Sequence, residues 1–97
     1  MAVSPMMPLD VPGLKTFVKT QTAMIKDHQA ELEWTKTECE ESSSFLKNAT
    51  SRSLKDLLIL FRNDAKQNIR WLTDEIAFHT KQLKTANVAI EKLKRKA

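Results

Sequence analysis

The chain has 97 residues, of which 41% are hydrophobic and 29% are charged, and its formal net charge is +4. This length allows one small domain at most and excludes doubly wound and barrel enzymes. All three prolines and the only glycine lie within the first 13 residues, so the remaining 84 lack the strongest helix breakers. Sheet folds, which need such turn residues, are therefore excluded, and we expect an all-α fold.

Residues 1–13 are predicted to form an extended leader. Each proline removes a backbone donor and disfavours helix in the residue before it. The leader is apolar enough to pack against another element, because it contains Met6, Met7, Leu9 and Val11. Asp10 is expected to cap the first helix, with Pro12 in its first turn.

A first helix is predicted over residues 14–41, where two columns of residues recur every seven positions and give a weak coiled-coil pattern. One column is apolar and consists of Val11, Val18, Ile25, Leu32, Cys39 and Leu46. The other column is mostly polar and consists of Leu14, Gln21, His28, Thr35 and Ser42. We interpret His28, and His79 in the second half, as hydrogen-bonded or partly exposed imidazoles. A register-fixing, pH-sensitive or metal-binding role is the alternative.

Residues 42–52 are predicted to form a turn, because serine, threonine and asparagine compete for backbone hydrogen bonds. A second helix is predicted over residues 53–96, with Ser53 and Asp56 as a variant capping box. Its heptads are stronger, with apolar residues at nine of ten seam positions. The run from Leu57 to Phe61 is apolar on every side, which favours burial on every side.

Charge favours antiparallel pairing of the two halves, because residues 1–51 carry a net charge of −2 and residues 52–97 carry +6. The predicted fold is thus a long, coiled-coil-like antiparallel helical hairpin. The alternatives are one continuous helix, or three helices with breaks near Ser42 and Asn68.

In the hairpin, the second helix exceeds the first by about 16 residues. This excess leaves a stripe without a partner in its own hairpin: Leu83, Ala86, Ile90 and Leu93. The leader could cover part of this stripe, but we expect other chains to cover it and complete a bundle.

No catalytic or cofactor-binding motif is found, since one glycine cannot build a phosphate loop and the histidines and cysteine lack metal-ligand spacing. We predict that the protein is not an enzyme and needs no cofactor or metal. It is predicted to be a helical assembly or scaffold subunit that binds protein helices in a homo- or hetero-oligomer. The predicted interface residues are Leu58, Phe61, Ile69, Leu72, Ile76, Leu83, Ile90 and Leu93, with Trp34 and Trp71 as anchors on secondary faces.

A basic patch lies near the C-terminus and consists of Lys81, Lys84, Lys92, Lys94, Arg95 and Lys96. Much of this patch is expected for a solvated helix face and for a helix C-terminus, where basic side chains interact favourably with the helix dipole. An alternative function is a small basic helical module that binds an acidic partner, nucleic acid or an anionic surface. A further alternative is a chaperone-like adaptor that masks a partner's helix.

The sequence also indicates a compartment. The lone Cys39 cannot form an internal disulfide, and the N-terminus does not resemble a secretory signal. The longest strongly apolar run has five residues, far fewer than a bilayer span needs. We therefore predict no transmembrane segment and an intracellular, reducing location, either cytoplasmic or nuclear.

Overall fold

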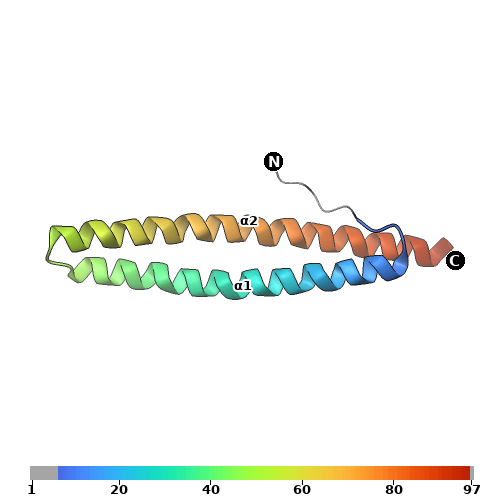
Figure 1. The fold of residues 1–97 in the computed structure, drawn as a ribbon, viewed down its shortest axis with the longest axis horizontal. Coiled ribbons are helices and arrows are strands. Elements are labelled where there is room, and N and C mark those ends of the chain that lie inside the picture. The colour runs from blue at the N-terminus through green and yellow to red at the C-terminus, as the bar shows by residue number, and fades with distance from the viewer. Residues whose placement is uncertain (1–6, 97) are drawn as a thin grey trace. The chain divides into compact units, whose positions relative to one another are not determined.

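In the computed structural model, which describes residues 7–96, the chain is an all-α antiparallel helical hairpin (Figure 1). Helix α1 spans Val11–Asn48 and helix α2 spans Arg52–Lys96. The predicted hairpin is therefore confirmed. The continuous helix is wrong because the chain turns after Asn48, and the three-helix arrangement is wrong because α1 and α2 run unbroken through Ser42 and Asn68. The first six residues of the predicted leader lie outside the described residues.

The hairpin divides into two compact units. Unit 1 comprises Met1–Lys26 and Ala77–Ala97, and unit 2 comprises Asp27–Ile76. Within each unit a stretch of α1 packs antiparallel against a stretch of α2 (Figure 1).

Asp10 precedes helix α1 in unit 1 and caps it, as predicted. The backbone N–H of Gly13 donates to Oδ1 of Asp10 at 3.1 Å, and the N–H of Leu14 donates to the Asp10 carbonyl at 2.9 Å. A Cβ atom on Gly13 would collide with the Asp10 carboxylate and would lie 2.7 Å from Cβ of Pro8. Glycine is therefore required here by the close approach of the leader and the cap.

The core of unit 1 joins the start of α1 to the end of α2. Leu14, Ala86 and Ile90 are all 8% exposed or less. Around them pack the partly buried Met7, Phe17, Val18, Ala89 and Leu93. The prediction that the Ala86–Leu93 part of the stripe lacks a partner in its own hairpin is therefore wrong. The reason is that α1 has 38 residues, not the predicted 28, so the 45 residues of α2 exceed it by only seven.

In unit 2 the turn is shorter than predicted and consists of residues 49–51. Helix α1 continues through Ser42 because serine costs only about 0.5 kcal/mol relative to alanine in a helix. Continuation also places Leu46, which is partly buried, at the next position of the apolar column. Helix α2 begins at Arg52, one residue before the predicted start. The N–H of Leu54 donates to Oγ of Ser51 at 3.0 Å, so Ser51 caps α2 in place of the predicted Ser53.

The core of unit 2 is thin. Leu58, Ala65 and Leu72 are its buried apolar residues. In the run Leu57 to Phe61, Leu58 is buried while the other four side chains are exposed. The burial on every side that this run favours is therefore not provided by the hairpin itself.

Candidate interaction site

Most of the predicted interface residues lie along the seam of the hairpin. Leu58, Leu72 and Ile90 are 8% exposed or less. The four others that are partly buried are Ile69, Ile76, Leu83 and Leu93. These seven side chains offer little free surface to another chain, because the hairpin already uses them.

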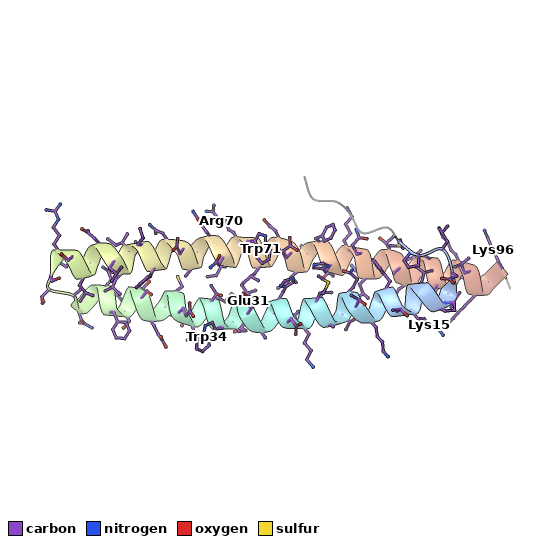
Figure 2. All side chains as sticks on the ribbon, in the orientation of Figure 1. Lys15, Glu31, Trp34, Arg70, Trp71 and Lys96 are labelled. Carbon is purple, nitrogen blue, oxygen red and sulfur yellow. The ribbon has the colours of Figure 1, made fainter. Side chains whose placement is uncertain are left out.

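The three remaining predicted interface residues are exposed, and all of them belong to unit 2. Trp34 is 66% exposed, Trp71 is 54% exposed and Phe61 is 51% exposed. Figure 2 shows the indole of Trp34 pointing away from α2. The ring of Trp71 meets the ring of His28 edge to face, with centroids 5.7 Å apart.

These aromatic residues belong to two exposed stripes of unit 2, which together we call the interaction face. The spacing of three and four residues places each stripe on one side of its helix. The stripe on α1 consists of Trp34, Glu38, Glu41 and Phe45. The stripe on α2 consists of Leu57, Phe61, Asp64, Asn68 and Trp71.

A groove of about 430 Å³ lies between the two stripes. Phe45 from α1 and Phe61 from α2 line it, and so do the smaller Ser42 and Ala65 and the buried Leu58. Because residues of both stripes line this groove, the two stripes lie on the same side of unit 2. The groove therefore has an apolar interior suited to side chains from another helix.

The charged residues that line the groove are all acidic: Glu38, Glu41 and Asp64. Their negative charge has the same sign as the net charge of unit 2, which is −3 because this unit holds seven basic and ten acidic residues. Unit 1 holds nine basic and two acidic residues, a net +7. The groove thus favours a partner that combines apolar and basic groups.

All six residues of the predicted basic patch are exposed and lie on α2 in unit 1. Lys94, Arg95 and Lys96 form the last turn of the helix, where basic side chains interact favourably with the helix dipole. The other three, Lys81, Lys84 and Lys92, lie closer to the N-terminus of α2, so the dipole at the end of the helix does not account for them.

The predicted hydrogen-bonded histidine is confirmed in unit 1. His79 is 5% exposed, and its Nδ1–H donates to Oε1 of the equally buried Gln21 at 2.5 Å. In unit 2, Cys39 is a free thiol and is partly buried.

Sequence reasoning missed six members of the interaction face: Glu38, Glu41, Phe45, Leu57, Asp64 and Asn68. A signal was present, since Trp34 and Phe45 are eleven residues apart and so share one side of a helix. Which flank of α1 lies beside which flank of α2, however, depends on the turn at 49–51. The predicted turn contains residues 49–51 but is too long and ends α1 at residue 41, and this early end concealed the groove.

The comparisons with known proteins add no identity: no family model, no curated protein and no solved structure matches this chain. Within residues 7–96, neither helix contains a stretch long and apolar enough to cross a membrane.

Proposed function

We propose that this protein is a non-catalytic helical assembly subunit that binds helices of other chains through the interaction face of unit 2. The observation that carries the proposal is the concentration of exposed apolar side chains in that unit. Large exposed apolar residues are found there at eight positions: Trp34, Phe45, Leu54, Leu57, Ile59, Leu60, Phe61 and Trp71.

Scattered exposed apolar residues are ordinary on a soluble protein, but a contiguous group marks an interaction site. The group in unit 2 includes two tryptophans and two phenylalanines, and both phenylalanines, Phe45 and Phe61, line the groove. Aromatic side chains dominate the energetics of many interfaces because they bury a large area with few rotatable bonds. Binding through this face would also bury Leu57 and Phe61, two of the four side chains of the Leu57–Phe61 run that the hairpin leaves exposed.

Sedimentation equilibrium tests the proposal. We expect the wild-type chain to sediment well above the 11.1 kDa of a single copy. The double variant Phe45→Ser/Phe61→Ser should weaken this assembly about 100-fold or more, since burying one such side chain contributes about 1.5–3 kcal/mol. Both rings are more than half exposed, so the hairpin should keep its helical circular dichroism spectrum.

The matched control is Leu9→Ser, which removes an apolar side chain that is 93% exposed but lies in unit 1. It should leave the assembled mass unchanged. A wild-type chain that is a stably folded monomer would overturn the proposed function.

A further inference from the structure

The outer side of α2 in unit 1 carries a second exposed stripe with the opposite charge, which we call the basic stripe. It consists of Lys81, Lys84, Val88, Lys92 and Arg95, at spacings of three and four residues. Val88 is its apolar centre and is 53% exposed. Two residues along a helix correspond to a rotation of about 200°, so Val88 lies on the side opposite the buried Ala86 and Ile90.

The basic stripe and the groove of unit 2 have complementary chemistry. The groove presents Phe45 and Phe61 as apolar walls, flanked by Glu38, Glu41 and Asp64. The basic stripe presents one branched apolar side chain with Lys84 and Lys92 one turn to either side of it. An amphipathic helix that lies in an apolar groove is a common mode of recognition.

We propose, on the basis of the assembly function above, that the partner helix is α2 of a second copy of this chain. The basic stripe of unit 1 in one copy binds the groove of unit 2 in another. Val88 lies between Phe45 and Phe61, and the neighbouring bases lie opposite the acidic groups of the groove.

Charge decides between this contact and the direct pairing of two grooves. Two grooves brought face to face would place Glu38, Glu41 and Asp64 of both copies together, and like charges in close contact are destabilising. Contact between unit 1 and unit 2 of different copies instead brings a net charge of +7 against −3. A second copy therefore supplies both the apolar and the basic groups that the groove favours.

Two charge-reversed variants test the proposal. One reverses the groove with Glu38→Lys, Glu41→Lys and Asp64→Lys. The other reverses the stripe with Lys84→Glu, Lys92→Glu and Arg95→Glu. All six side chains are exposed, so the fold should survive, and circular dichroism would verify this for each variant.

We expect each variant alone to self-associate about 100-fold more weakly than wild type at low salt, since three attractions become repulsions. An equimolar mixture of the two should recover association to within about threefold of wild type, because each reversed surface then finds its complement. Sedimentation equilibrium of the separate and mixed proteins measures both effects.

The matched control is Lys15→Glu/Lys19→Glu/Lys26→Glu, which changes the charge of unit 1 by the same amount on α1. It should alter association less than about threefold. Assembly of wild type together with unaffected single variants, or with no recovery on mixing, would overturn this contact and leave the assembly function standing. A titration with DNA tests the alternative role of the basic stripe. If wild type binds DNA, and the stripe variant loses this binding but keeps its self-association, the proposed contact is overturned and the stripe is assigned to nucleic acid. A monomeric wild type would instead overturn the assembly function itself.

Discussion

At the scale of single residues, the most informative contact is the buried hydrogen bond between Gln21 and His79 in unit 1. Gln21 is 3% exposed, so its amide has given up water, and the imidazole replaces part of that hydration. A shift of α1 by one heptad toward the end of α2 would place Gln21 beside Ala86, which cannot donate to Oε1. The bond therefore favours one register of the helices in unit 1 over the next, as single buried polar residues do in coiled coils.

We predict that Gln21→Leu lowers the free energy of unfolding by about 1–3 kcal/mol, because the histidine loses a buried acceptor. Urea unfolding followed by circular dichroism, at one fixed protein concentration, measures the change. Gln29→Leu makes the same substitution at an exposed position on α1 and should change stability by less than about 0.5 kcal/mol. Equal changes in the free energy of unfolding for the two substitutions would show that the hydrogen bond between Gln21 and His79 makes no specific contribution to stability.

At the scale of elements, the hairpin depends on how α1 ends and α2 begins. Only residues 49–51 separate the helices. The N–H of Ala49 donates to the carbonyl of Leu46 at 3.4 Å at the end of α1. At the start of α2, Ser51 accepts two hydrogen bonds from the backbone. Its Oγ accepts from the N–H of Leu54, and its carbonyl accepts from the N–H of Lys55 at 3.0 Å. One serine thus satisfies two of the backbone donors in the first turn of α2.

We predict that Ser51→Ala destabilises the hairpin by about 1 kcal/mol, because a backbone donor loses its cap. Ser53→Ala is the matched control, since Ser53 lies inside α2 and alanine is the better helix former there. It should be neutral or slightly stabilising. Thermal unfolding of the two variants beside wild type gives the comparison, and a larger effect at Ser53 would assign the cap to that residue.

The hairpin, its antiparallel direction and the Asp10 cap could be predicted from the sequence, because the breakers lie before Leu14 and the halves differ in charge. The end of α1 could not. The small penalty for helical serine is outweighed when Leu46 gains a partly buried position, and this gain depends on contacts distant in the sequence. The same error produced the predicted uncovered stripe at Ile90, since the length of α1 decides what covers α2.

At the scale of the whole molecule, charge is segregated more sharply than the total of +4 indicates. Unit 1 carries +7 and unit 2 carries −3, because acids are concentrated along α1 after Lys26 and bases along α2 after Ala77. The predicted division of charge between the two halves of the sequence was therefore only part of the pattern. A molecule with such a distribution attracts other copies of itself at long range when the salt concentration is low.

We predict that self-association of wild type weakens about tenfold between 0.1 M and 1 M sodium chloride, because the Debye length falls from about 10 Å to about 3 Å. Sedimentation equilibrium across this range measures the dissociation constant. The stripe variant Lys84→Glu/Lys92→Glu/Arg95→Glu should show the opposite trend, since salt screens its repulsion from the groove. Association of wild type that is insensitive to salt would show that the apolar contacts act without the charges.

The position of the two tryptophans has a practical consequence. The chain contains no tyrosine, and Trp34 and Trp71 both lie in unit 2 with more than half of their surface exposed. Intrinsic fluorescence under selective excitation therefore comes from unit 2 alone and from indoles that are largely in water. Any helix that covers the interaction face moves these indoles into a less polar environment, and the emission shifts to shorter wavelength. The protein thus contains its own optical probe of occupancy at this face.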